Sequence, residues 1–300
     1  LARGISGVIV IYIINPWRIR FGFQKAAAKK LLSFGLPFQT NSILALIKDD
    51  LLIVYLGRVL PLAQIGYIGF AQKWAFTPLR LIMDNVIRVT FPSFSRLQND
   101  KEVLTKAIEK SIFAACFLIF PALIGLVVLA PYFIHLIPKY IKWEPAILSL
   151  CFFAINAGLS SVSTPLTNAL NAIGKIKITL YLMVFWTVAT WVITPLAIMR
   201  FGFSGVSFAS AFIALSVIFV VIISKRYIKF SIGKIIINPF LAAVFMGGVT
   251  YLLSPMIVKN IPMLIFMIVL GAVIYFSTMF VLAKNQIMSD IRFVRENLKK

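Results

Sequence analysis

The amino-acid sequence predicts an all-α protein, a polytopic integral membrane helix bundle with about nine transmembrane helices. Hydrophobic residues make up 61% of the 300 residues and charged residues only 13%, whereas charged residues are about 25% of an average soluble domain. The stretches 145–174, 201–224, 235–258 and 260–283 contain no Asp, Glu, Lys or Arg. Each exceeds the ~20 residues that a helix needs to cross the hydrocarbon core of a membrane.

Pro and Gly mark many of the joints between the apolar runs, and these joints divide the chain into helices. The predicted helices are 1–17, 31–56, 62–92, 104–130, 144–171, 176–199, 204–224, 235–257 and 262–284. Several prolines fall inside these segments, which membrane helices tolerate because neighbouring helices satisfy the freed carbonyl groups.

The basic residues predict the orientation of the helices. Of the thirty Lys and Arg residues, twenty lie in the tail and in alternate connections, six lie in the opposite set of connections, and four lie inside helices. Because cytoplasmic loops carry an excess of Lys and Arg, we expect the C-terminus in the cytoplasm.

Composition also narrows the class of function. The net charge of +21 is not that of a nucleic-acid-binding protein, because the basic residues punctuate apolar runs and form no separate basic module. Cys116 and Cys151 lie within apolar segments and His135 is the single histidine, so we predict no metal site and no cofactor. The connections on the outer side are short, which argues against an enzyme that must hold an acceptor there.

A stripe of polar residues runs along the segment 62–92. Lys73, Thr77, Arg80, Asp84 and Arg88 are spaced by 4, 3, 4 and 4 residues, which places them within an arc of about 80° on a helix. Asp84 stands four residues from both arginines, so an ion-pair ladder that holds helices together is one interpretation. The stripe remains net positive, however, which favours a water-filled lumen or an anionic ligand, and Arg suits phosphate.

A second group of polar residues lies in the segment 31–56. Gln39, Ser42, Asp49 and Asp50 share a face of roughly 100°, with Lys48 on the other side. A second interpretation is that the charged residues Lys48, Asp49 and Asp50 lie near the outer membrane interface and are simply solvated there.

A third, uncharged strip lies in the segment 144–171. It consists of Asn156, Ser160, Ser163, Thr164, Thr167 and Asn171. Such residues either bond neighbouring helices or line a path for a hydroxyl-rich cargo such as a sugar. Three polar stripes on three helices favour a shared lumen.

Three short motifs carry a resemblance to a known family. They are LLSFGLP at 31–37, VTFPSFSRLQND at 89–100 and LNAIGK at 170–175. The chain resembles the second half of the polysaccharide-transporter flippases of the multidrug/oligosaccharidyl-lipid/polysaccharide exporter superfamily, in particular the bacterial exporters of O-antigen, colanic acid and other exopolysaccharides.

The resemblance implies a fourteen-helix plan of two six-helix bundles and two additional helices. The chain starts at Leu1 within an apolar run, and we expect a C-terminal fragment of a longer protein. On this plan the parts are the last helix of a missing N-terminal bundle (1–17), a cytoplasmic basic connection (18–30), the C-terminal bundle (31–226), two additional helices (235–285) and a cytoplasmic basic tail (286–300).

The resemblance also implies a function. Relatives move undecaprenyl-pyrophosphate-linked oligosaccharides across the bacterial inner membrane by alternating access. Arg80, Arg88 and Lys73 are then expected to contact pyrophosphate or an acidic sugar, and Asp84 to organise them. The implied partners are this lipid-linked oligosaccharide, membrane lipids, and the polymerase and assembly proteins of polysaccharide synthesis.

The remaining candidate residues follow the same implication. Thr77, Asn156, Ser160, Thr164 and Thr167 are candidates to line the substrate cavity. Asp49 and Asp50 are candidates for coupling transport to an ion or proton.

Three other functions compete with this interpretation. A cation-coupled multidrug exporter of the same superfamily is the first, although its site should favour carboxylates and aromatic residues. A membrane enzyme acting on lipid-linked sugars and a membrane scaffold are the others. The sequence has no clustered His, Cys or carboxylate pair for such an enzyme, and a scaffold has no need of charged stripes inside the membrane.

Overall fold

The protein is helical throughout the part of the chain that the computed structural model describes, residues 2–14, 24–231 and 233–297. The all-α prediction is confirmed. The elements in chain order are α1 (Ala2–Ile14), α2 (Lys25–Val59), α3 (Leu62–Leu97), α4 (Lys101–Leu136), the 3-10 helix η1 (Pro138–Ala146), α5 (Ile147–Ala172), α6 (Ile176–Phe201), α7 (Ser204–Ala214), α8 (Val217–Lys225), α9 (Gly233–Ile257) and α10 (Ile261–Asn297).

Each predicted helix has a counterpart, with differences at the ends. Residues 15–17 of the first predicted helix and residues 18–23 of the expected connection lie outside the described residues. Helix α2 begins at Lys25, inside the expected connection. The predicted helix 204–224 is divided at Leu215 and Ser216 into α7 and α8. The last helix continues past residue 284 through most of the expected tail, to Asn297.

Local chemistry sets several helix boundaries. The carboxylate of Asp100 accepts hydrogen bonds from the backbone N–H groups of Glu102 and Val103, both at 3.1 Å, and so caps the start of α4. Gly174 and Gly202 have positive φ angles of 77° and 58°. They turn the chain after α5 and α6, in a region of backbone space that glycine enters without steric cost.

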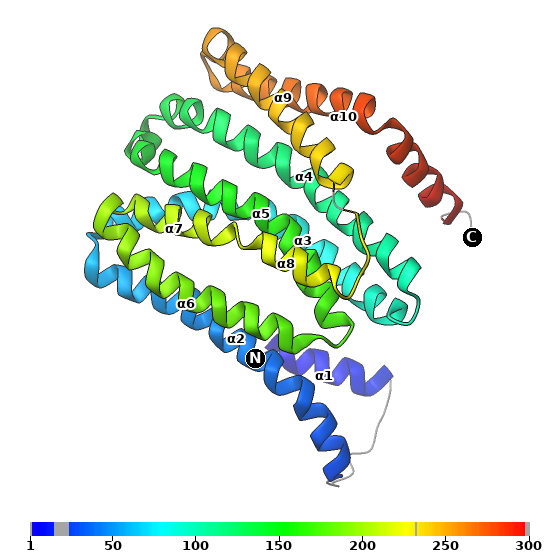
Figure 1. The fold of residues 1–300 in the computed structure, drawn as a ribbon. Helices are drawn as coiled ribbons and strands as arrows, with labels where there is room; N and C mark the ends of the chain where they lie inside the picture. The colour runs from blue at the N-terminus through cyan, green and yellow to red at the C-terminus, as the bar shows by residue number, and fades with distance from the viewer. Residues whose placement is uncertain (1, 15–23, 232, 298–300) are drawn as a thin grey trace.

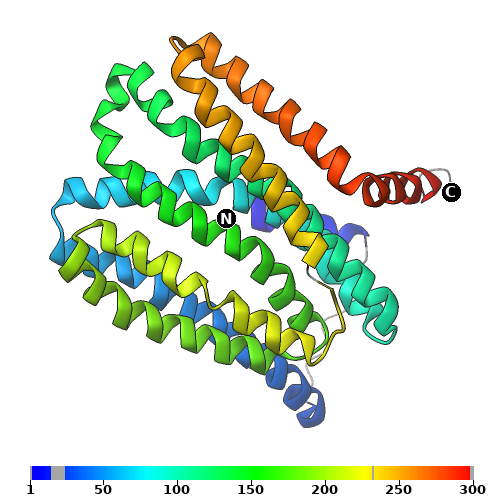
Figure 2. The ribbon, with the colours of Figure 1, turned by 45° about the horizontal axis from the view of Figure 1, so that its top comes forward.

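The helices pack around α4 and α5 (Figures 1 and 2). Helix α5 contacts α3, α4, α7 and α8, whereas α4 contacts α9, and α10 lies against α9 and α4. On the other side of the bundle α2 packs against α6, and α6 against α7. Ile112 and Leu166 are almost fully buried in the core between α4 and α5.

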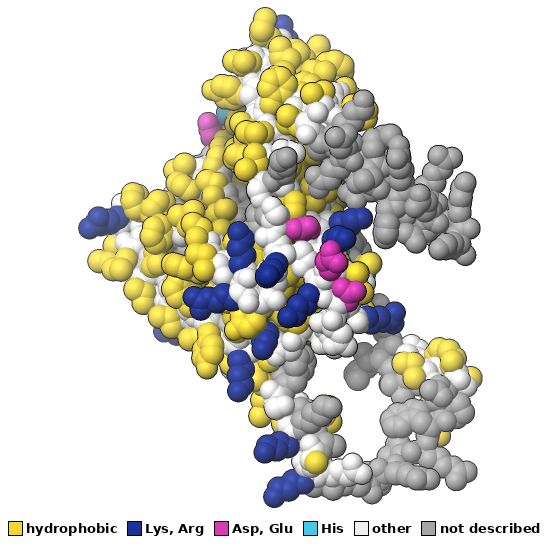
Figure 3. Space-filling model, turned by 45° about the vertical axis from the view of Figure 1, so that its right-hand side comes forward, with side chains coloured by type: hydrophobic (Ala, Val, Ile, Leu, Met, Phe, Trp, Pro, Cys, Tyr) yellow, Lys and Arg dark blue, Asp and Glu magenta, His cyan; other side chains and the backbone are white. Residues whose placement is uncertain are grey.

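The connections alternate between the two ends of the bundle (Figure 1). Those that join α3 to α4, α5 to α6 and α8 to α9 lie at one end, and they carry the exposed basic residues Lys101, Lys175, Lys225, Arg226 and Lys229. Those that join α2 to α3, α4 to α5, α6 to α7 and α9 to α10 lie at the opposite end. In Figure 3, Lys and Arg side chains accordingly gather in the lower half, beside broad hydrophobic surfaces.

Six helical segments of the described residues are long and apolar enough to cross a membrane, fewer than the nine expected. They are Lys101–Leu136, Pro138–Ala172, Ile176–Phe201, Ser204–Lys225, Ile235–Ile257 and Ile261–Leu282. Helix α1 is shorter. Helices α2 and α3 have 35 and 36 residues, which is ample length, but their polar and charged residues lower their hydropathy.

Candidate functional site

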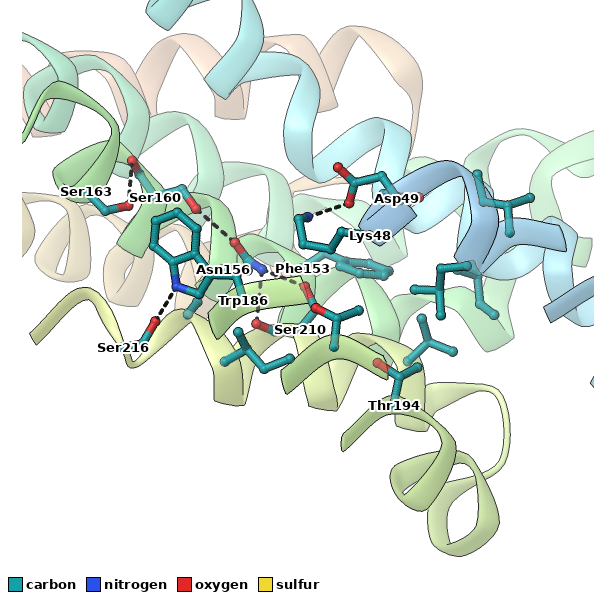
Figure 4. Close-up of a pocket in the computed structure, with 18 of the residues that line it drawn as sticks. Lys48, Asp49, Phe153, Asn156, Ser160, Ser163, Trp186, Thr194, Ser210 and Ser216 are labelled. Carbon is teal, nitrogen blue, oxygen red and sulfur yellow. Dashed lines mark hydrogen bonds and ion pairs between the residues drawn. The ribbon is translucent and has the colours of Figure 1, made fainter. Parts of the chain in front are cut away.

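A cavity of about 440 Å³ lies inside the bundle, where α2 and α3 diverge (Figure 4). These two helices contact each other only sparsely, because α2 packs against α6 and α3 against α5. The polar residues that line the cavity are Lys48 and Asp49 of α2, Gln72 of α3, Asn156, Ser160, Ser163, Thr164 and Thr167 of α5, Trp186, Thr190 and Thr194 of α6, Ser210 of α7, and Ser216.

An ion pair stands at the α2 wall of this cavity. The Nζ atom of Lys48 lies 2.5 Å from Oδ1 of Asp49, and the two side chains are 24% and 56% exposed. The prediction that Lys48 lies on the other side from the acidic residues is wrong, because its long side chain reaches round the helix to its neighbour. Asp50 is exposed and does not line the cavity.

The rest of the predicted α2 group also lies away from the cavity. Gln39 and Ser42 are exposed, and neither is among the lining residues. The Ser42 hydroxyl donates instead to the carbonyl oxygen of Phe38 on its own helix at 3.4 Å.

The strip on α5 combines helix-to-helix hydrogen bonds with cavity lining. The Asn156 amide donates to the carbonyl oxygen of Ser210 at 3.0 Å and to its hydroxyl at 2.5 Å, and it accepts from Ser160 at 2.9 Å. Asn171 accepts from the hydroxyl of Thr179 on α6 at 2.6 Å. Two members of the strip therefore bond neighbouring helices, as one of the two interpretations predicts.

The other members of the strip use their hydroxyl groups locally. Ser163 and Thr167 donate to carbonyl oxygens three residues earlier, those of Ser160 and Thr164, at 3.4 and 3.0 Å. Their side chains remain on the cavity wall. The hydroxyl lone pairs facing the cavity can still accept hydrogen bonds.

Helix α6 contributes a wall that the sequence interpretation missed. The indole Nε1 of Trp186 donates to the hydroxyl of Ser216 at 2.8 Å, at the break between α7 and α8 (Figure 4). Trp186, Thr190 and Thr194 recur every four residues, and this helical spacing could have identified them. Ser216 had no comparable signal, because it stands alone in an apolar run.

The stripe on α3 lies on a different face from the cavity. Lys73, Thr77, Arg80, Asp84 and Arg88 are all exposed, and none lines the cavity. The face of α3 that packs inward carries small and apolar residues instead. The expected lumen shared by three polar stripes is therefore not this cavity, where the α5 strip meets only Asp49 of the α2 group and no residue of the α3 stripe.

The ion-pair ladder on α3 is also absent among the described residues. No ion pair joins Asp84 to Arg80 or Arg88 there. In the same described residues, the only side-chain hydrogen bond within the stripe runs from the Thr77 hydroxyl to the carbonyl oxygen of Lys73, at 2.6 Å. Coulomb attraction between exposed side chains is weak, and it is offset by the loss of side-chain entropy. Three cationic groups on this face are thus left without a bonded acid.

The described residues contain no group of three or more His, Cys, Asp or Glu side chains that could hold a metal ion. The thiol of buried Cys116 lies 3.7 Å from the Ser161 hydroxyl, inside the interface between α4 and α5. These side chains have a packing role.

The sequence of this chain is similar to those of several proteins of polysaccharide biosynthesis. Residues 1–148 match the family model described as "Polysaccharide biosynthesis protein". The lipopolysaccharide biosynthesis protein WzxC of Escherichia coli K12 is 29% identical over 165 residues, which are 55% of this chain and 33% of WzxC. The succinoglycan biosynthesis transport protein ExoT of Rhizobium meliloti is 23% identical over 246 residues, 81% of this chain and 47% of ExoT.

A solved structure shares the fold. The lipid II flippase MurJ, in an inward closed conformation, superposes with a TM-score of 0.70 at 15% sequence identity, over 94% of this chain and 61% of MurJ. The chain thus has a MurJ-like helical fold. It spans between about a third and a half of the length of these two curated relatives.

Proposed function

Because this chain is a relative of polysaccharide biosynthesis transport proteins, we propose that it forms one bundle of a flippase for lipid-linked oligosaccharides. The cargo is an oligosaccharide linked to undecaprenyl pyrophosphate, for surface polysaccharide synthesis. The protein moves this cargo without altering it chemically. The polymerase and assembly proteins that use the flipped units are its further partners.

The observation that carries the proposal is the cationic stripe on α3. Lys73, Arg80 and Arg88 lie on one exposed face and have no bonded acid within the described residues. Ionisable groups cost ~2.5–3.5 kcal/mol each at the centre of a membrane-spanning helix, and so they face a water-filled cavity or a partner. Pyrophosphate is such a partner, because guanidinium groups bind phosphate oxygens in pairs.

In this proposal the stripe faces a second bundle, and the cargo lies between the two. Rocking of one bundle against the other then exposes the cargo site to alternate sides of the membrane. The lipid tail stays in the bilayer while the glycan and pyrophosphate pass between the bundles. Thr77 and Asp84 stand beside the arginines on the same face, and we assign them to positioning the cargo.

The internal cavity has a different role, the coupling of transport to a cation or proton. Asp49 is a carboxylate at the wall of a cavity rich in hydroxyl and amide oxygens, the ligands that hard cations prefer. We therefore keep Asp49 as the coupling candidate and give Asp50, which lies outside the cavity, no such role. Ser160, Thr164 and Thr167 line this coupling cavity in the proposal.

We place the protein in the bacterial inner membrane with its basic end, and hence its C-terminus, in the cytoplasm. The gathering of exposed Lys and Arg at the end that holds the α5–α6 and α8–α9 connections supports this orientation. A C-terminal reporter active only in the cytoplasm tests it.

The stripe is tested by replacing its arginines in the intact transporter. We expect Arg80→Ala/Arg88→Ala to lower surface polysaccharide and to cause lipid-linked units to accumulate on the cytoplasmic side. Arg96→Ala is the matched control, because Arg96 is an exposed arginine on the same helix outside the stripe. Unchanged export in the double variant, at wild-type protein levels, would refute anion binding by the stripe.

The coupling site is tested separately. We expect Asp49→Asn to make transport in vesicles independent of an imposed sodium or proton gradient, while the neighbouring Asp50→Asn leaves that dependence unchanged. Equal effects of the two substitutions would remove the cavity from the coupling mechanism.

A further inference from the structure

A second concave surface, apolar rather than polar, lies between α8 and α9. This α8/α9 groove has a volume of about 740 Å³, within the range of roughly 300–1,000 Å³ typical of ligand pockets. Helices α4 and α5 form its floor, and α8 and α9 contribute its walls. The groove has no hydroxyl, amide or charged side chain in its lining.

Packed side chains of α4, α5 and α9 form part of the groove surface. Phe120 of α4 meets Phe240 of α9 edge to face, with ring centroids 5.8 Å apart. A Cβ atom at Gly158 would lie 3.8 Å from Phe120 and Leu123, an ordinary van der Waals distance, so α5 lies close to these side chains of α4. The rim consists of exposed apolar side chains that include Ile222.

One end of the groove meets a basic segment. Helix α8 ends at Lys225, three residues after the groove residue Ile222, and the connection to α9 follows. Lys225, Arg226 and Lys229 are exposed on this stretch, whereas Ile228 and Phe230 are buried in the core and anchor it. The exposed cations therefore lie on the anchored segment that follows the groove-lining part of α8.

Two further contacts fix this basic segment. The ammonium group of Lys175 lies 5.2 Å from the centre of the Tyr227 ring, which brings a fourth cation to the cluster. The carboxylate of Glu109 accepts the backbone N–H of Ser231 at 2.8 Å. This hydrogen bond ties the segment to α4.

We infer that the α8/α9 groove binds an anionic phospholipid, with an acyl chain in the groove and the phosphate on the basic segment. Charge complementarity selects this occupant, because basic pockets at helix ends on the cytoplasmic side of membrane proteins bind anionic lipid head groups. A zwitterionic lipid gains the same apolar contacts but less from the cations. The groove shares one lining residue, Val217, with the polar cavity and none with the α3 stripe, so the inference does not depend on the proposed cargo and coupling roles.

The charge part of the inference is tested with the intact protein in detergent and two lipids, phosphatidylglycerol and phosphatidylcholine, by native mass spectrometry. We expect Arg226→Gln/Lys229→Gln to weaken phosphatidylglycerol binding about tenfold or more, since each cation near an anionic surface contributes roughly a fivefold preference. Phosphatidylcholine binding should be unchanged. The matched control is Lys25→Gln/Lys29→Gln, which removes two exposed cations at the start of α2.

The groove part is tested by filling it. Ile218→Trp/Ile222→Trp places two indoles in the groove and should weaken the binding of both lipids, whereas Phe219→Trp, on the same helix but outside the lining, should not. An equal loss of phosphatidylglycerol binding in Arg226→Gln/Lys229→Gln and in the control Lys25→Gln/Lys29→Gln would indicate general attraction between the lipid and a basic surface. That result would overturn the inference. Preferential binding of a polyprenyl phosphate, or disulfide-linked dimers of an Ile222→Cys variant, would assign the groove to another occupant and also overturn it.

Discussion

The polar stripes of α3 and α5 occupy helices that pack against each other, yet they have opposite characters. The α5 strip is uncharged and half-buried, and Asn156 bonds two groups of Ser210. The α3 stripe is charged and exposed, and its arginines have no bonded acid among the described residues. Similar helical spacing thus produces a hydrogen-bonded seam in one case and an exposed, charged face in the other.

The difference follows from where each helix sits. Helix α5 contacts five other α-helices, so its polar groups must satisfy one another, and uncharged amides and hydroxyls do this at low cost. Among the residues that the structure describes, the outer face of α3 has no neighbour that supplies acids, and its charges need water or an anion. Burial therefore separates the polar residues that bond neighbouring helices from the charged residues that remain exposed.

The largest effect is expected when a cation is moved from the α3 environment to that of α5. Ser161→Lys places an ammonium at a fully buried position of α5 and should destabilise the protein by about 3 kcal/mol or more, because the charge lacks a partner. Thr77→Lys, at an exposed position of the α3 stripe, should change stability by less than about 0.5 kcal/mol. Denaturant titration of both variants measures the difference, and similar values would remove the contrast.

A smaller effect is expected when the charge of the stripe is kept but its shape is changed. Arg80→Lys/Arg88→Lys should reduce export about tenfold, or ~1.4 kcal/mol, since Lys lacks the planar fork that binds phosphate oxygens in pairs. Protein stability should stay unchanged. Export equal to wild type would mean that the stripe acts only as a diffuse positive field.

A hydrogen bond outside the α5 strip, at the break between α7 and α8, tests another part of the cavity wall. Trp186→Phe removes the hydrogen bond to Ser216 and should cost about 1 kcal/mol of stability. Adding Ser216→Ala in a double-mutant cycle isolates the bond itself. Additive effects of the two substitutions would show that the indole and hydroxyl do not interact.

The smallest effect is expected from Asp84→Asn. Because Asp84 forms no ion pair with the neighbouring arginines, its neutralisation should change the free energy of unfolding by less than about 0.5 kcal/mol. A loss of more than 1 kcal/mol would restore the ion-pair ladder that the sequence spacing suggested.

The helices of this protein could be predicted from the sequence, because long apolar runs and their Pro and Gly joints act locally. The same holds for the stripe from Lys73 to Arg88, whose positions on one face follow from helical spacing alone. The break at Ser216 could not be predicted, since neither Pro nor Gly stands there. It coincides with the hydrogen bond that Trp186 donates from another helix.

The residues that each polar stripe contacts could not be predicted from the sequence either. Asp49 and Asp50 were both predicted as coupling candidates, but only Asp49 lines the cavity. Asp50 lies outside it, because successive residues point about 100° apart on a helix. The α6 wall of Trp186, Thr190 and Thr194 follows a detectable period, but its role depends on the packing of α6 against α2 and α7.

By itself the sequence determined an all-α membrane bundle, the alternation of basic and less basic connections, and the face of α3 that carries three cations. These properties depend on composition and on helical period, which each segment carries within itself. Only the tertiary structure decided that α2 and α5 enclose a polar cavity while the α3 stripe remains outside it. That choice depends on which helices pack together, and packing is set by shape complementarity between segments far apart in the chain.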